Sequence, residues 1–296
     1  MVTKWDTRQA VIGVTGATGG VGRRVAARLA QRGVPQRLVV RDPGRAPSLA
    51  GAEVVQASSY GDFDAMRAAL EAVPTLFLVS AGEDPHRVQL HRTAVDAAVA
   101  AGVRRLVYLS FLAAAPNATF TFARDHFFTE EHIRSTGLPF TFLRSSIYLD
   151  FLPFLCSAEG VIRGPAGTGR VAPASRDDIA DVATAVLTGK GHDGRTYDMT
   201  GPEAVTMAGV AGELTRVTGR PISYLEETLE EARASRVPTG APAWEIEGWV
   251  TTYAAIASGE LDVVSDTVEK VAGHRPESIP EFFSRHPESY IHLLSE

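Results

Sequence analysis

The sequence predicts an α/β fold in which a doubly wound parallel sheet is accompanied by a smaller, mainly helical C-terminal region. Three observations lead to this prediction. Short β-branched runs alternate with longer alanine-rich helical patterns over the first half of the chain. A glycine-rich turn joins the first predicted strand to the first predicted helix. The run at 75–79 is apolar throughout, as a strand covered on both faces must be.

Six strands are expected within the first 150 residues. After the first strand, Val21, Val25 and Leu29 recur every four residues and form one stripe of a helix that ends near Gly33. Further helices are predicted around Phe63–Leu70, at 85–101 and at 124–135. The strands are predicted at 10–14, 37–40, 53–56, 75–79, 105–109 and 139–143. This alternation indicates right-handed crossovers, with ligands bound beyond the carboxyl ends of the strands.

The alternation stops after Asp150. The Gly- and Pro-rich stretch 160–173 is expected to be a loop or a hairpin. A helix opens near Asp177 with acidic residues at its positive end, and a further strand is predicted at 196–199. The remainder is predicted to consist mostly of short helices, which include 208–218 and 225–235.

Composition narrows the class of protein. The 296 residues are 45% hydrophobic and 22% charged, with a net charge of −6, which is typical of a globular protein without a nucleic-acid partner. No stretch approaches the roughly 20 apolar residues of a membrane span. Residues 1–10 lack the apolar core of a signal peptide, and the single Cys156 leaves neither a disulfide nor a metal-binding cluster. We expect a cytoplasmic protein with a small-molecule partner and no metal.

The glycine turn predicts a dinucleotide site. Gly16-x-x-Gly19-x-x-Gly22 lies between a strand and a helix, which is the context that makes such a motif meaningful. The first glycine permits a tight turn, the second lets the backbone approach a pyrophosphate, and the third lets the helix pack on its strand. The helix N-terminus, at Gly20 and Val21, supplies amide donors and positive potential. The alternative is a tight turn that binds nothing.

The end of the second strand favours NADP(H) over NAD(H). Nineteen residues past Gly22, where NAD enzymes commonly place an acid for the ribose diol, this chain has Arg41. A guanidinium can hydrogen-bond a 2′-phosphate. Asp42 follows directly and could still reach a ribose hydroxyl, and Arg41 could also be an ordinary exposed loop residue.

These motifs suggest two functional regions. Residues 1–150 are expected to form a dinucleotide-binding Rossmann domain, joined by 176–200, and residues 151–296 a smaller substrate or lid region. A second glycine-rich run, 164–169, looks like a phosphate loop. It lacks the lysine–serine pair and is followed by no helical pattern, so we interpret it as a turn.

Several segments resemble the NmrA-like atypical short-chain dehydrogenase/reductases, and in particular their NAD(P)H:quinone oxidoreductase branch. They are Thr-Gly-Ala-Thr-Gly-Gly-Val-Gly at 15–22, Val-Val-Arg-Asp-Pro at 39–43, Leu-Val-Tyr-Leu-Ser at 106–110, Ser-Thr-Gly-Leu-Pro-Phe-Thr-Phe-Leu-Arg at 135–144, and the segments 176–180 and 273–276. The resemblance implies hydride transfer from NADPH to a quinone or similar conjugated acceptor. It also implies cofactor contacts at Gly16, Thr18, Gly19, Gly22, Arg41, Ser80, Ala81, Gly82 and Ser110.

One departure from the larger superfamily bears on catalysis. Orthodox members carry Tyr-x-x-x-Lys on the helix after the fifth strand, whereas the corresponding segment here reads His126-Phe127-Phe128-Thr129-Glu130. Quinone reduction tolerates the loss of this dyad, because the reduced oxygen is a stabilised phenolate that needs little acid assistance. His126 could donate a proton or only support the nicotinamide pocket. Tyr148 could line the same pocket or belong to the core.

Three functions therefore remain open from the sequence. The first is an NADPH-dependent quinone-type oxidoreductase. The second is a non-catalytic NADP(H) sensor that acts through a protein partner, since some NmrA-like regulators also lack the dyad. The third is a tailoring reductase for a natural product, which would use the same chemistry on another substrate. A homo-oligomer is compatible with the sequence, which carries no signal for one.

Overall fold

The computed structural model describes residues 11–294, so Ala10 of the first predicted strand lies outside the described part. The chain forms two compact units that interleave along the sequence. Unit 1 contains the residues up to Ser110, Phe128–Leu143 and Ala180–Tyr197. Unit 2 contains Phe111–Phe127, Arg144–Ile179 and the residues from Asp198 onward.

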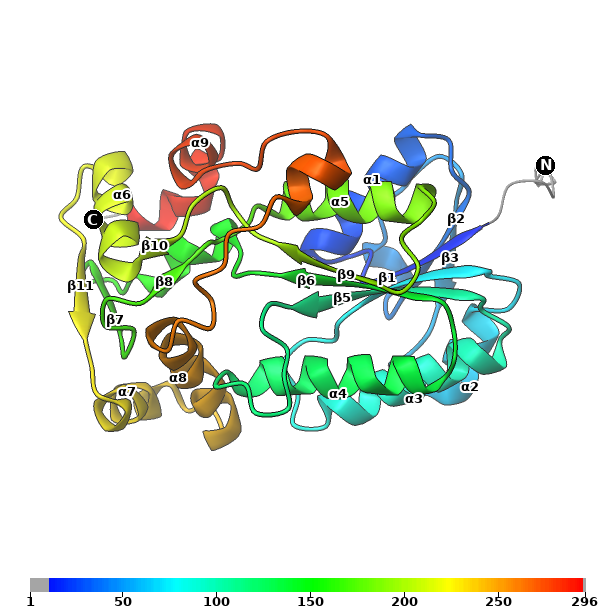
Figure 1. Ribbon diagram of the computed structural model, residues 1–296, viewed down its shortest axis with the longest axis horizontal. Helices are drawn as coiled ribbons and strands as arrows, with labels where there is room; N and C mark the ends of the chain where they lie inside the picture. The colour runs from blue at the N-terminus through cyan, green and yellow to red at the C-terminus, as the bar shows by residue number, and fades with distance from the viewer. Residues whose placement is uncertain (1–10, 295–296) are drawn as a thin grey trace. The chain divides into compact units, whose positions relative to one another are not determined.

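A seven-stranded sheet with the order β3-β2-β1-β4-β5-β6-β9 is the centre of the fold (Figure 1). Its strands are β1 (Ile12–Thr15), β2 (Gln36–Val40), β3 (Ala52–Gln56), β4 (Thr75–Val79), β5 (Arg105–Phe111), β6 (Phe140–Ser145) and β9 (Arg195–Met199). β1 pairs in parallel with β2 on one side and with β4 on the other, so that Ile12 lies opposite both Gln36 and Thr75. The strand order therefore reverses beside β1, and the carboxyl ends of β1 and β4 flank the crevice where such sheets bind ligands.

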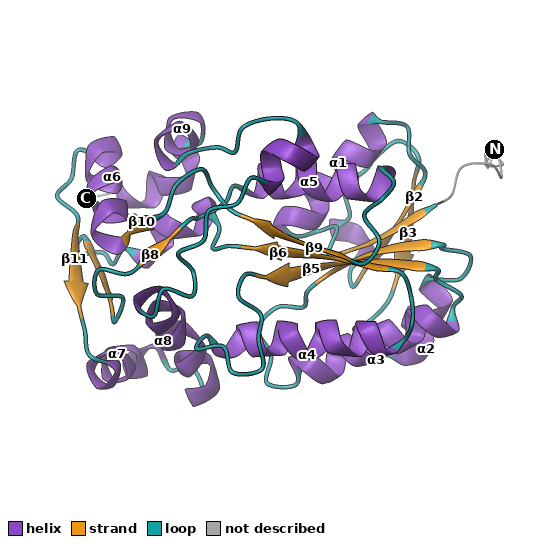
Figure 2. Cartoon of the chain, viewed as in Figure 1, coloured by secondary structure: helices purple, strands orange, loops and turns teal. Residues whose placement is uncertain are grey.

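Helices cover both faces of this sheet. Figure 2 shows α1 and α5 on one face and α2, α3 and α4 on the other. Their bounds are α1 (Gly20–Gln31), α2 (Phe63–Ala69), α3 (Arg87–Ala100), α4 (Thr121–Ser135) and α5 (Arg176–Thr188). The predicted doubly wound sheet is thus confirmed.

The core of unit 1 explains the apolar run that predicted β4. Leu76, Phe77 and Leu78 are fully buried, because helices cover both faces of the strand. Leu106 and Tyr108 of β5 are fully buried in the same way. Each such side chain contributes about 1.5–3 kcal/mol by leaving water, so this central part of the sheet is the rigid base for the strand ends.

The described part of unit 2 contains, besides short 3-10 and π helices, four short strands and four α-helices. They are β7 (Val161–Gly164), β8 (Arg170–Val171), β10 (Val205–Thr206), β11 (Ser223–Glu226), α6 (Met207–Thr218), α7 (Leu229–Arg236), α8 (Ala243–Ala257) and α9 (Ile279–Arg285). β7 and β8 do not pair with each other: β7 pairs in parallel with β11, and β8 pairs antiparallel with β10. The hairpin considered for 160–173 is therefore wrong, since the partners of both strands come from beyond residue 200.

Two helices of unit 2 differ from the sequence prediction. The helix expected at 225–235 begins only at Leu229, because Thr228 and Glu231 form a reciprocal capping box at its start. Leu225 lies in β11 instead. α8 was not predicted, since it buries residues on several sides and so lacks a single apolar stripe. Within residues 11–294, no helix combines the length and the hydropathy needed to cross a membrane.

Candidate dinucleotide site

The glycine turn after β1 is too tight for side chains. Gly16 has φ +63°, and a Cβ there would lie 2.9 Å from the Cβ of Val79. A Cβ at Gly22 would lie 2.3 Å from the carbonyl oxygen of Gly16. The Gly19 N–H donates to that same oxygen at 2.9 Å, which closes the turn. Glycine is therefore required at Gly16 by conformation and at Gly22 by the close approach of α1 to the turn.

The N-terminus of α1 suits an anion. Gly19 is its N-cap, and no side chain in the described residues caps the helix there. The first turn also contains no acidic residue. The first amides of α1, which include those of Gly20 and Val21, therefore have no side-chain cap and lie at the positive end of the helix dipole. A pyrophosphate matches both the uncapped amides and the space that the glycines leave, so the residues fit a dinucleotide.

Arg41 and Asp42 differ in how much of each side chain is engaged. Asp42 accepts the Gly44 N–H at 2.9 Å and caps the short 3-10 helix Pro43–Arg45, so one of its oxygens serves the turn. Arg41 is exposed, and its carbonyl accepts from the Gln56 side chain at 3.0 Å. The backbone of Arg41 is thereby fixed while its guanidinium remains at the surface. This arrangement favours Arg41 as the residue that meets a ligand phosphate.

The segment after β4 is held by side chains. The Ala81 N–H donates to Nε2 of His91 at 2.8 Å, and the Ala81 carbonyl accepts from Nε of Arg87 at 3.1 Å. Two residues before Ala81, at the end of β4, Val79 donates to Thr15 Oγ1 and accepts from the Tyr60 hydroxyl at 2.7 Å. Sequence reasoning included Thr15 only as part of the glycine-rich segment and missed His91, Arg87 and Tyr60. The available signal was the pair of polar residues four apart on one face of α3.

The end of β5 carries Ser110, whose hydroxyl donates to Oε1 of Glu130 at 2.6 Å. Both side chains are buried. Arg134, one helical turn further along α4, lies 3.7 Å from the other oxygen of Glu130. A serine hydroxyl has one proton, and Ser110 directs it at a carboxylate in this structure.

The two catalytic candidates lie in unit 2. His126 is buried, and its ring stacks on Phe111 with centroids 6.2 Å apart. Tyr148 lies under the guanidinium of Arg176, which is 4.7 Å from the ring centroid, and Arg176 also pairs with Asp150 at 3.3 Å. These contacts agree with supporting roles for both rings, and burial of His126 limits its access to a substrate in this conformation.

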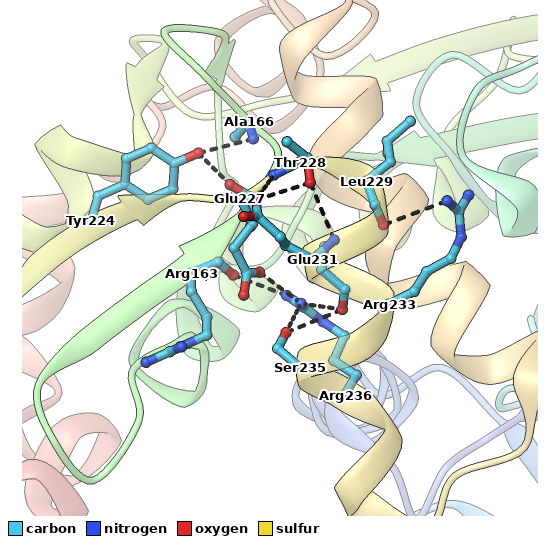
Figure 3. A network of polar contacts seen from close by, with 12 residues as sticks. Arg163, Ala166, Tyr224, Glu227, Thr228, Leu229, Glu231, Arg233, Ser235 and Arg236 are labelled. Carbon is cyan, nitrogen blue, oxygen red and sulfur yellow. Dashed lines mark hydrogen bonds and ion pairs between the residues drawn. The ribbon is translucent and has the colours of Figure 1, made fainter.

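The second glycine-rich run, 164–169, is a packed turn. A Cβ at Gly164 would meet the Tyr253 ring at 2.6 Å, and one at Gly169 would lie 2.1 Å from the Ile256 carbonyl. Close by, the Tyr224 hydroxyl donates to the Gly164 carbonyl and accepts the Ala166 N–H (Figure 3). The glycines thus make room for neighbours rather than for a phosphate, which agrees with the sequence interpretation.

The same part of unit 2 contains a buried ion pair. Arg236 pairs with Glu227 at 3.0 Å and donates from its other nitrogen to the Arg163 carbonyl at 2.9 Å (Figure 3). Its guanidinium also lies 5.5 Å from the Tyr253 ring centroid. This network ties β7, β11 and α7 together, and its partners are satisfied within the protein, so we treat it as structural.

The residues predicted for the cofactor follow the carboxyl ends of four neighbouring strands. The glycine turn follows β1, Arg41 follows β2, Ser80–Gly82 follow β4, and Ser110 lies near the end of β5. Because parallel strands present their carboxyl ends at one edge of the sheet, these segments share that edge. The fold and this edge together define a protein that binds a dinucleotide.

Comparisons with known proteins agree with this definition. A family model described as NAD(P)H-binding matches residues 16–190. A (4-alkanoyl-5-oxo-2,5-dihydrofuran-3-yl)methyl phosphate reductase from Streptomyces griseus is 38% identical, covering 94% of this chain and 98% of that protein. An NAD(P)H azoreductase from Xenophilus azovorans is 32% identical, with coverage of 94% and 98%.

A solved structure extends the similarity to the whole fold. The NADPH-dependent quinone oxidoreductase from Escherichia coli, complexed with NADPH, superposes with a TM-score of 0.84 at 32% identity, covering 96% of this chain and 100% of that one. The chain belongs to the NAD(P)H-binding family. Its predicted place near the NAD(P)H:quinone oxidoreductases is confirmed, and a solved structure of NmrA, at 17% identity, shares the fold.

Proposed function

We propose that the protein is an NADPH-dependent oxidoreductase that delivers hydride to a quinone or a similar conjugated acceptor. The observation that carries this proposal is the uncapped N-terminus of α1 over a glycine turn, followed by the exposed Arg41. The similarity to an NADPH-dependent quinone oxidoreductase supports it. Arg41 supports NADP(H) over NAD(H), because a guanidinium can pair with the 2′-phosphate that distinguishes the two.

The substrates in the relatives' names share one chemical property. A quinone, an azo bond and a dihydrofuranone whose ring double bond carries two carbonyl groups are all electron-poor conjugated systems. Each one spreads the charge left by hydride addition over a heteroatom or an enolate. Such acceptors need little acid assistance, which agrees with the absence of a Tyr-x-x-x-Lys dyad from this chain.

Each cofactor residue has a proposed task. The turn would hold the pyrophosphate, Arg41 the 2′-phosphate, and the segments at β4 and β5 the nicotinamide half. The residues that we propose for these contacts are Gly16, Thr18, Gly19, Gly20, Val21, Gly22, Arg41, Ser80, Ala81, Gly82 and Ser110. When bound, the reduced nicotinamide supplies the hydride. Residues 151–296 are proposed to supply the substrate or lid region.

The chain's own residues constrain the source of the proton. Ser110 directs its hydroxyl proton at Glu130, so it offers lone pairs, and not a proton, to any group beside it. The reduced acceptor would then take its proton from water or from His126. These routes differ in the His126→Ala variant: a lower kcat at unchanged NADPH affinity would assign the proton to His126, and an unchanged kcat would assign it to water.

Steady-state oxidation of NADPH tests the proposed function. We expect simple quinones, and enones flanked by two carbonyls, to accelerate it, and isolated ketones to leave it at the background rate. Gly19→Asp is the control, because a carboxylate at the turn would repel the pyrophosphate and abolish binding. Tight NADPH binding without turnover on any acceptor, together with capture of a protein partner, would support the sensor alternative instead.

Two further proposals concern the cellular location and the oligomeric state of the protein. Cys156 is buried, and burial raises the pKa of its thiol, so it is a poor thiolate and fits a reducing compartment such as the cytoplasm. Fractionation of the source cells would test this location. Light scattering at several protein concentrations would decide between a monomer and a homo-oligomer.

A further inference from the structure

Both polar groups of the Ala81 backbone are bonded to side chains from the start of α3. His91 Nε2 accepts the N–H at 2.8 Å, and Arg87 Nε donates to the carbonyl at 3.1 Å. Arg87 and His91 are four residues apart, so they extend from one face of the helix toward the same peptide. The loop after β4 is therefore oriented by two side chains on one rigid element.

The hydrogen bond from Ala81 defines the protonation of His91. Because Nε2 accepts, it carries no hydrogen, and the neutral ring must carry its hydrogen on Nδ1. Nδ1 lies 2.9 Å from Thr129 Oγ1 of α4 and 3.4 Å from the Tyr108 hydroxyl of β5. His91 is fully buried, and this burial, together with the charge of Arg87, lowers its pKa to about 3. The ring therefore stays neutral over the physiological range.

Burial of this ring is not explained by packing alone. Burying an imidazole costs free energy that Leu or Phe in the same place would not, unless its ring nitrogens are hydrogen-bonded. Here Nε2 is bonded to a loop peptide rather than to a helix or strand. The neighbouring Val79 is also held on both sides, by Thr15 and by Tyr60. The polar contacts thus converge on the segment from Val79 to Ala81.

We propose that His91 is a positioning residue for the cofactor site: its neutral ring holds the Ala81 peptide so that Ser80–Gly82 keep the conformation that receives the cofactor. The inference rests on the proposed function, which makes this loop part of that site. His91 connects the loop to α4 and β5, the elements that carry Glu130 and Ser110. It would therefore keep two strand ends of the site in register.

Two substitutions test the roles of the two ring nitrogens of His91 separately. Gln at position 91 can place an oxygen where Nε2 accepts the Ala81 N–H, and Asn can place a polar group only near the position of Nδ1. We expect His91→Asn to weaken NADPH binding, measured by fluorescence titration, by about tenfold or more, and His91→Gln by about threefold or less. His192→Gln is the matched control, since His192 precedes β9 at the opposite end of the strands and hydrogen-bonds Tyr197 through Nδ1, whose position Gln leaves empty.

The melting temperatures distinguish positioning from general destabilisation. If His91→Asn and His192→Gln lower Tm similarly but only His91→Asn weakens NADPH binding, the proposal holds. Equal losses of affinity in His91→Asn and His91→Gln would overturn it, and so would an unchanged affinity in His91→Asn. Because NADPH binding is measured without an acceptor, the affinities of the variants can be compared even if the protein turns over no quinone.

A second measurement does not depend on the cofactor at all. Nitrogen-15 NMR of the wild-type protein should show His91 protonated at Nδ1 and bare at Nε2. Amide hydrogen exchange at Ala81 should accelerate about tenfold or more in His91→Asn and much less in His91→Gln. A proton on Nε2, or equal exchange rates in the two variants, would overturn the inference even if both variants fold poorly.

Discussion

The Ser110 hydroxyl donates to the buried carboxylate of Glu130 at 2.6 Å and so joins the end of β5 to α4, the helix that carries His126–Glu130 in place of the Tyr-x-x-x-Lys dyad. By resemblance, Glu130 stands in the position of the dyad lysine. The charge at that position is therefore inverted. The chain therefore has neither the tyrosine that donates the proton in the orthodox enzymes nor the lysine that assists it. An acceptor that stabilises its own anion matches this site.

Loss of the Glu130 carboxylate should destabilise the protein. In Glu130→Ala, the buried Ser110 hydroxyl loses its acceptor, and we expect the free energy of unfolding to fall by about 1–3 kcal/mol. Glu130→Gln keeps an acceptor oxygen and should lose less. Urea unfolding monitored by circular dichroism measures both values. A Glu130→Ala protein as stable as the wild type would show that the hydrogen bond contributes nothing net.

Gly22→Ala should damage the cofactor site. The new methyl group would lie 2.3 Å from the Gly16 carbonyl oxygen, so α1 must move away from the turn. We expect a loss of about 1–3 kcal/mol in stability and at least a tenfold loss in NADPH affinity. Gly212→Ala is the control, since Gly212 is an exposed residue in the middle of α6 and an added Cβ would have no atom within 4 Å. There we expect unchanged binding and a gain of about 0.5–1 kcal/mol.

Arg41→Ala should change the choice of cofactor. We expect NADPH affinity to fall by about ten- to a hundredfold, because a charge-assisted hydrogen bond to the 2′-phosphate is lost, while NADH affinity changes little. Calorimetry with both nucleotides measures the ratio. Arg32→Ala removes the same charge at the far end of α1 and should leave the ratio unchanged. A parallel loss for both nucleotides would contradict the 2′-phosphate role.

Stability should fall as the pH decreases from about 6.5 toward 3. The ordinary pKa of histidine is 6.5, whereas burial and the charge of Arg87 hold that of the folded His91 at about 3. Between these values the unfolded chain binds one more proton, so this contribution to folding is full above pH 6.5 and declines by up to about 1.4 kcal/mol per pH unit below it.

The difference between wild type and His91→Gln isolates this contribution. The groups packed around the ring, which are Arg87, Tyr60, Tyr108 and Thr129, are the same in both proteins. Urea midpoints at pH 7, 5.5 and 4.5 should therefore decline more steeply for the wild type. Parallel curves would show that the folded ring takes up its proton as readily as the unfolded one.

Local patterns predicted the sheet well, because each strand is a short apolar run bounded by turn residues. The run at 75–79 matches β4 residue for residue. The glycine spacing likewise predicts the tight turn directly, since Gly16 and Gly22 are only six residues apart along the chain. In unit 2, by contrast, β7 lies about 60 residues from its partner β11, and α8 is apolar on several sides, so neither has a local signal.

The sequence by itself determined the sheet, the glycine turn, the position of Arg41 and the absence of the dyad, since each of these depends on residues that are near one another along the chain. Tertiary structure alone decided that His91 holds the Ala81 peptide and that Ser110 directs its proton at Glu130. Both contacts join residues from different elements, and packing of the helices against the sheet brings them within hydrogen-bond distance. Local periodicity carries no record of such contacts, and they constrain the chemistry of the site more closely than the motifs do.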